Sequence, residues 1–73
     1  MSDDLCVRVD YYNDGKMVPI SFVQNNSTTK FIRKIKRIWH ENDAQSQEII
    51  RYSCLLTDET IIILSYKNGR WYI

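Results

Sequence analysis

The 73-residue sequence predicts an all-β fold, a small antiparallel meander of five or six strands curled into a barrel or a tight sheet. Three observations lead to this prediction. Short segments alternate between apolar and polar residues, which is the period of a strand. Turn signals separate these segments at short intervals, which favours pairing between sequence neighbours. The longest apolar run, residues 61–64, is far too short to span a membrane as a helix.

Length and composition indicate one small β domain over residues 1–73, because a domain usually takes about 100–200 residues. Hydrophobic residues make up 44% of the chain, which suits a compact globule. Ten Lys and Arg nearly balance nine Asp and Glu, so the net charge of +1 favours no nucleic-acid, membrane or acidic partner. The acidic start lacks the pattern of a secretory signal, which predicts a cytoplasmic protein with its two cysteines, Cys6 and Cys54, free and buried.

The first two strands are expected on either side of a hairpin turn. Residues 5–12 alternate cleanly, and Asp14-Gly15 then gives a strong hairpin signal. Residues 17–24 resume the strand pattern. Pro19 lacks a backbone N–H, so this second strand is expected at an edge or with a bulge. The polar residues 25–29 are typical of a loop.

Residues 30–42 fit two structures. Phe31, Ile35, Ile38 and Trp39 have the spacing of one helix face, and a helix at 30–42 would make the fold α+β. The same residues are aromatic or β-branched, which favours a strand. The pattern alone leaves both alternatives open.

The second half of the chain reads as strands joined by turns. After a polar loop at 43–47, residues 48–56 alternate, and 57–59 form a tight turn. The apolar run within 60–66 is typical of a central strand buried on both faces. Asn68-Gly69 predicts a type I′ turn that leads into a last short strand at 71–73.

Five blocks occur in a fixed order along the chain: VRVD at 7–10, DGKMVPI at 14–20, IKRIWH at 35–40, IRYSC at 50–54 and GRWYI at 69–73. This order resembles a group of short uncharacterised proteins from Firmicutes. The resemblance covers nearly the whole chain and implies a bacterial protein. It also favours a strand at 30–42, because the corresponding block alternates in the group. It implies no activity and no functional residue.

The sequence argues against an enzyme. His40 is the sole histidine, and its neighbours Glu41 and Asp43 would point elsewhere or into solvent. No nucleophile is placed against it, and no glycine-rich phosphate loop exists. The two cysteines and His40 lack metal-ligand spacing. We therefore expect no cofactor and no metal, and little room for a ligand pocket of about 300 Å³ or more.

The basic segment is the sharpest candidate site. Residues 30–37 hold five of the ten positive charges, namely Lys30, Arg33, Lys34, Lys36 and Arg37. With Trp39 they suggest a small barrel that binds single-stranded nucleic acid. A regular strand would put Lys34 and Lys36 on one face and the two arginines on the other, which weakens this hypothesis. The alternative is that these charges protect an exposed strand edge from aggregation.

The leading prediction is therefore a non-catalytic protein-interaction or structural module, a monomer or weak homodimer without a membrane partner. Tyr66, Trp71 and Tyr72 are the candidate interface residues, because Trp and Tyr dominate binding hot spots. An edge strand is the other candidate interface. Single-stranded nucleic acid bound by the basic segment is the alternative function.

Overall fold

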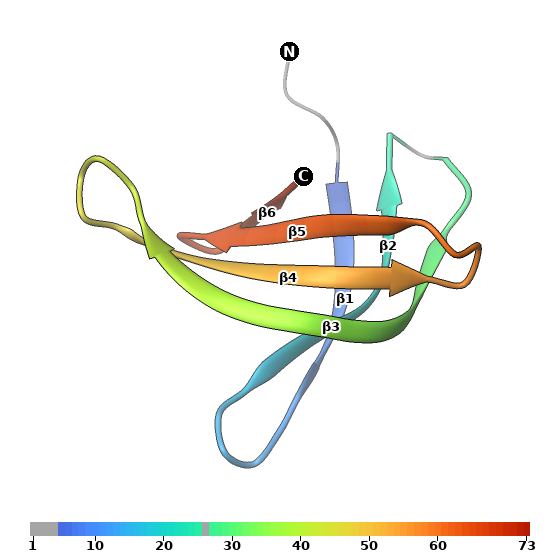
Figure 1. Cartoon of the computed structure of the whole chain (residues 1–73), viewed down its shortest axis with the longest axis horizontal. Coiled ribbons are helices and arrows are strands. Elements are labelled where there is room, and N and C mark those ends of the chain that lie inside the picture. The colour runs from blue at the N-terminus through green and yellow to red at the C-terminus, as the bar shows by residue number, and fades with distance from the viewer. Residues whose placement is uncertain (1–4, 26) are drawn as a thin grey trace.

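The computed structural model describes residues 5–25 and 27–73, and it confirms the all-β prediction (Figure 1). Antiparallel strands follow one another in meander order around a nearly closed barrel. They are β1 (Leu5–Tyr11), β2 (Met17–Gln24), β3 (Lys30–Asn42), β4 (Glu48–Leu56), β5 (Ile61–Lys67) and β6 (Arg70–Tyr72). The α+β alternative is wrong, because residues 30–42 form a strand throughout.

The predicted turns are confirmed. Three hairpins use the same three-residue loop, whose third residue has a positive φ: Gly15 at 86°, Ser46 at 63° and Glu59 at 72°. This is a common hairpin form, in which a type I turn is followed by a residue in the left-handed conformation. Between β5 and β6, Asn68 and Gly69 both have positive φ values, 51° and 77°, as a type I′ turn requires.

The predicted irregularity at Pro19 is a β-bulge. Arg8 of β1 pairs with Ser21, but the next residue, Val9, pairs with Pro19. Ile20 is therefore the extra residue of β2. A bulge suits this position, because proline has no N–H to give to a regular ladder.

Two further bulges explain why β3 resembled a helix in sequence. Ile32 and Lys34 pair with the consecutive residues Leu56 and Leu55, so Arg33 is an extra residue in the ladder between β3 and β4. Ile35 and Arg37 likewise pair with Cys54 and Ser53, so Lys36 is a second extra residue. The bulges set the inward residues Ile32, Ile35 and Ile38 three positions apart instead of two. A period of three in a strand imitates the period of a helix.

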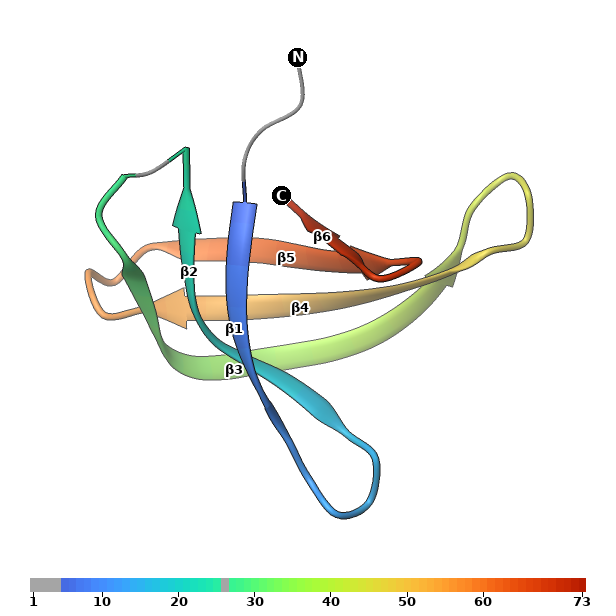
Figure 2. The ribbon, with the colours of Figure 1, turned by 180° about the vertical axis from the view of Figure 1, so that it is seen from behind.

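The β1–β2 hairpin crosses over the sheet formed by β3, β4, β5 and β6, as Figure 2 shows from behind. The two parts share only two paired positions, Ser21 with Phe31 and Phe22 with Lys30. Between them lies the core of Phe22, Tyr52, Cys54, Leu56 and Leu64. β1 and β6 approach each other, but no ladder joins them in the described part of the chain, so the barrel is not fully closed.

Two expectations about burial need correction. Ile61 and Ile63 are 55% and 43% exposed, so β5 is not buried on both faces. In a single curved sheet only one face of each strand meets the core, and here Ile62 packs against the core and Leu64 belongs to it. Both cysteines are free, but only Cys54 is buried, because Cys6 lies on the outer face of β1.

Candidate functional site

The bulges of β3 bring four of its five basic residues, Arg33, Lys34, Lys36 and Arg37, to one exposed surface, whereas Lys30 precedes them and pairs with the core residue Phe22. Lys34 and Arg37 pair with Leu55 and Ser53, which alternate with inward residues on β4. Arg33 and Lys36, the extra residues, are exposed as well, while Ile32 and Ile35 pack against the core. The expected division of these charges between two faces assumed a regular strand, and the bulges remove it.

Two of the five cations are neutralised by the turn between β4 and β5. Lys30 Nζ lies 3.7 Å from the Asp58 carboxylate, and Arg33 donates a 2.8 Å hydrogen bond to Glu59. Among the described residues, Lys34 and Lys36 have no ion pair. Arg37 places its guanidinium carbon 5.1 Å from the centroid of the Trp39 ring. Such a cation–π contact covers the aromatic face that a nucleic-acid base would need.

Trp39 also belongs to a polar network on the outer face. Hydrogen bonds from Arg51 and then from Trp39 hold the pKa of Glu41 below its usual value. Arg51 in turn donates a 2.7 Å hydrogen bond to the buried Ser65 hydroxyl. This network fixes Trp39, half-buried, in the sheet surface. Its ring is therefore a poor platform for stacking a base.

The three predicted interface aromatics do not share a surface. Trp71 and Tyr66 are half-buried and face inward, with ring centroids 4.9 Å apart. Trp71 also lies 5.5 Å from the ring of Tyr52 in the core. Tyr72 follows Trp71 and points to the opposite face, as neighbouring strand residues do. Of these three aromatic residues, only Tyr72 is exposed.

An open strand edge is the most distinctive feature of the backbone. β6 is short and pairs with residues 65–67 of β5, so no strand in the described part of the chain pairs with residues 61–64 on that side. Lys67 and Arg70 flank a two-residue turn and therefore exchange hydrogen bonds. Because alternate residues of a strand direct their backbone groups to the same side, Ile63 and Ile61 also face the β6 side. No ladder among the described residues pairs their N–H and C=O groups.

An apolar groove of about 400 Å³ lies next to this edge, with Ile62 of β5 among its lining residues. Phe22, Leu56 and Ile62 form its apolar part, and Ile73 lies at the end next to β6. Its rim is polar, with Ser27, Thr28, Thr60 and the Lys30–Asp58 ion pair among the lining residues. The sequence predicts a last short strand at 71–73 after a longer one at 60–66, which is an indirect signal of this edge.

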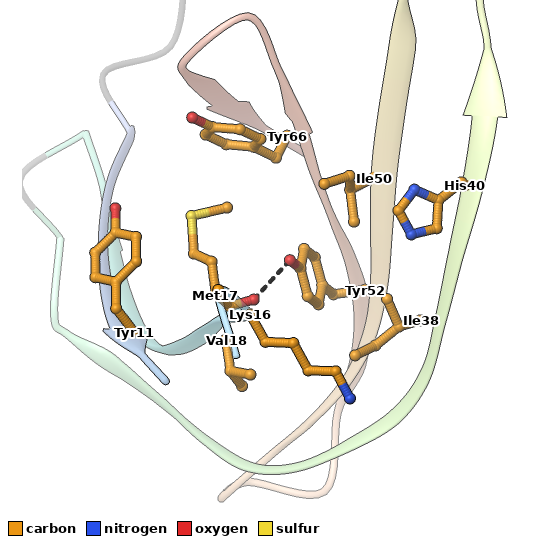
Figure 3. A pocket seen from close by; sticks show the side chains of 10 residues that line it. Tyr11, Lys16, Met17, Val18, Ile38, His40, Ile50, Tyr52 and Tyr66 are labelled. Carbon is orange, nitrogen blue, oxygen red and sulfur yellow. Dashed lines mark hydrogen bonds between the residues drawn. The ribbon is translucent and has the colours of Figure 1, made fainter. Parts of the chain in front are cut away.

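A second cavity, here called the hairpin cleft, lies between the β1–β2 hairpin and the strands β3, β4 and β5 (Figure 3). It holds about 460 Å³. The expectation of little room for a pocket of this size was therefore wrong. That expectation was drawn from the small size of the domain, whereas the two-position junction of β2 and β3 lets the hairpin diverge from the sheet.

Within the described part of the chain, His40 has a carboxylate as its hydrogen-bond partner, and not a serine or a cysteine. The partner of His40 is Glu48 on β4, whose carboxylate lies 3.0 Å from His40 Nδ1. It is neither Glu41 nor Asp43, the acidic residues near His40 in the sequence. Burial raises the pKa of the Cys54 thiol to about 11, so the thiol stays protonated near neutral pH.

Within residues 5–25 and 27–73, no group of three or more His, Cys, Asp or Glu side chains could hold a metal ion. In the same ranges no helix has the length and apolar character needed to cross a membrane.

In comparisons with known proteins, no family model, no curated protein and no solved structure matches this chain. The resemblance to the Firmicutes group therefore stays a prediction. The candidate sites rest on the geometry alone: the basic outer face of β3, the open edge of β5 with its groove, and the hairpin cleft.

Proposed function

We propose that the protein is a non-catalytic interaction module that binds an extended segment of a partner protein along the open edge of β5. One observation carries the proposal: no described strand pairs with Ile61 and Ile63 on the β6 side of β5, and an apolar groove lined by the intervening Ile62 lies next to them. An added strand would supply alternating donors and acceptors to both residues, which is how sheet edges capture extended peptides.

β1 does not itself pair with the open edge of β5. Neighbouring strands lie about 4.8 Å apart. No Cα atom of β1 comes within 8 Å of a Cα atom of β5. β6 and Ile73 limit the site at one end, and the turn at 57–59 limits it at the other. The edge therefore accommodates a segment of about four residues, because its unpaired stretch is residues 61–64.

The surroundings indicate what the segment would contain. Side chains of a strand alternate between faces. One set would enter the groove over Phe22, Leu56 and Ile62, which favours apolar side chains. The other set would lie on the outer face beside Ile61 and Ile63. Because Lys30 and Asp58 neutralise each other at the groove, we expect an uncharged segment of alternating apolar and hydroxyl residues.

The test uses a capped hexapeptide of alternating Val and Thr, followed by amide NMR. We expect saturable shifts and slower hydrogen exchange at the amides of Ile61 and Ile63. The same peptide, N-methylated at every second residue so that one edge loses its donors, should bind at least tenfold more weakly. Binding that is indifferent to methylation would contradict strand addition.

Two substitutions of Ile61 distinguish binding through its backbone N–H from binding through its side chain. Ile61→Pro removes an N–H that points to the open edge, whereas Ile61→Ala keeps it. We expect at least a tenfold loss of peptide affinity for the proline variant and less than a threefold loss for the alanine variant. If the free protein instead protects these amides in a concentration-dependent way and sediments as a dimer, the occupant is a second copy and not a partner protein.

A second candidate function is the binding of single-stranded nucleic acid on the outer face of β3. It is favoured by the bulges, which expose Lys34, Lys36 and Arg37 together, with Phe31 exposed on the same strand. An oligothymidine titration at about 50 mM and about 200 mM salt tests it, because counterion release makes such binding fall steeply with salt. Reversing the charge of Lys34 and Lys36 should abolish the shifts. The matched reversal of Arg8 and Lys16, which are exposed on other elements, should not.

A further inference from the structure

The hairpin cleft is a separate site from the β5 edge, at the other end of the barrel. We propose that it binds a neutral, flat aromatic molecule that carries an N–H or O–H donor. The shape of the cleft, the residues that line it and the charges at its rim indicate this ligand. The site is independent of the proposed binding of a protein segment.

The cleft has the size and composition of a ligand site. Its 460 Å³ falls within the range of about 300–1,000 Å³ that small-molecule pockets occupy. Its walls come from separate parts of the chain, with Met17 and Val18 on the hairpin side and Ile38 and Ile50 on the sheet side (Figure 3). Such a pocket has apolar walls and only a few polar groups, which is the usual make-up of a specific site.

The cleft is held open by the fold. The hydroxyl of Tyr52, a side chain only 3% exposed, donates a 2.7 Å hydrogen bond to the Met17 carbonyl oxygen. This bond joins the two walls at one point (Figure 3). Around this bond the walls enclose the cavity of about 460 Å³, and Ile38 and Tyr11 stay exposed. A ligand would therefore find a preformed site and would not have to separate packed side chains.

The lining favours an aromatic ring. Tyr11, Tyr52 and Tyr66 approach the cleft from three different strands, and the thioether of Met17 extends between them (Figure 3). Aromatic rings pair favourably in stacked or edge-on arrangements. Sulfur adds favourable contacts with ring edges, and the flexible methionine side chain adapts to the shape of its neighbour.

The rim favours a neutral ligand with a donor. The one lysine that lines the cleft has an acid beside it, because Lys16 Nζ lies 3.9 Å from the Asp14 carboxylate. An anionic ligand would therefore gain little. His40 Nδ1 lies 3.0 Å from the Glu48 carboxylate, and in the tautomer that donates from Nδ1 to Glu48 its Nε2 is an acceptor. A ligand N–H or O–H can satisfy that acceptor.

The test compares two probes, 2-naphthol, which has an O–H donor, and 2-methoxynaphthalene, which has the same rings and no donor. Amide and methyl NMR should show saturable shifts at Val18, Ile38 and Ile50 with both probes. We expect 2-naphthol to bind at least fivefold more tightly. His40→Phe should remove that difference. Equal affinities of the wild-type protein for the two probes would overturn the assignment of the ligand class.

Neighbouring tyrosines provide the matched variants. Tyr11 lines the cleft and Tyr12 does not, although both are exposed, at 74% and 54%. Tyr11→Leu should weaken 2-naphthol at least fivefold, whereas Tyr12→Leu should leave its affinity unchanged. Because both side chains are exposed, both variants should keep the wild-type melting temperature. Shifts scattered over the surface without saturation, or equal losses in the two variants, would overturn the proposal.

Discussion

The Tyr52 hydroxyl on β4 donates a hydrogen bond of 2.7 Å to the carbonyl oxygen of Met17 at the start of β2. The two residues are 35 positions apart in the chain. Their contact joins the β1–β2 hairpin to the main sheet, which it otherwise meets at only two paired positions. One buried side chain therefore helps to set the angle between the two parts of the barrel.

Removing this hydroxyl should destabilise the protein. Tyr52→Phe leaves a carbonyl oxygen without its partner, at a cost of about 1–2 kcal/mol in the free energy of unfolding. Urea denaturation measures the change. Tyr66→Phe is the control, because the described structure gives the Tyr66 hydroxyl no hydrogen-bond partner, and its effect should be close to zero. Equal losses in the two variants would show that the bond to Met17 is unimportant.

Deleting Lys36 tests the second bulge of β3. Lys36 is the extra residue between the pairs Ile35–Cys54 and Arg37–Ser53, so its deletion leaves a regular ladder with every other residue on its present face. We expect a folded protein that loses no more than about 2 kcal/mol of stability. If β3 were a regular strand, the deletion would turn residues 37–42 to the opposite face and unfold the protein. An amide NMR spectrum distinguishes these results.

Gly69→Val tests the type I′ turn. Gly69 has a φ of 77°, and no atom lies within 4 Å of the position its Cβ would take, so the cost is backbone strain alone. We expect a loss of about 1–2 kcal/mol and a lower melting temperature. Arg70→Val, one residue later in the strand, should have little effect, since β-branched residues suit strands. A wild-type melting temperature for Gly69→Val would refute the turn.

Cys54 should make the protein less stable in alkali. Its pKa is about 11 in the folded protein against 9.0 for a free thiol, because the thiolate is disfavoured in the core. Above pH 9 the unfolded chain loses this proton while the folded chain keeps it, so stability falls as pH rises. Between pH 9 and 10 the fall is about 1 kcal/mol.

The control for this pH dependence is Cys54→Val, which lacks the thiol. Its free energy of unfolding should stay nearly flat from pH 9 to 10. Burial also raises the pKa of Tyr52 above its usual 10.0, so that a further loss in both proteins begins at higher pH. Identical slopes for the two proteins between pH 9 and 10 would show that Cys54 does not carry the effect.

Local patterns were sufficient to predict most of the strands. The alternation at 5–12 predicts a strand, and the dipeptides Asp14-Gly15 and Asn68-Gly69 predict turns. Each of these structures is determined by a few neighbouring residues, so its prediction did not depend on the rest of the fold. The bulge at Pro19 was predictable for the same reason, since the missing N–H is a property of the residue itself.

The bulges of β3 and the binding surfaces were not predictable in this way. Whether Arg33 and Lys36 are extra residues depends on the partner strand, β4, whose register is set by burial of Cys54 and Leu56. The exposure of Ile61 and Ile63 depends on which face of β5 meets the core. The open edge and the hairpin cleft arise from the length of β6 and the splay of the hairpin, and both are tertiary properties.

The meander order also has a consequence for how the chain folds. Every ladder in the described part joins strands that follow one another in sequence. Each hairpin can therefore form with a small loss of loop entropy before the next is added. All-β domains usually fold slowly because their pairings are distant in sequence. This protein should refold faster than sandwiches of similar length, and stopped-flow fluorescence of Trp39 and Trp71 would follow the reaction.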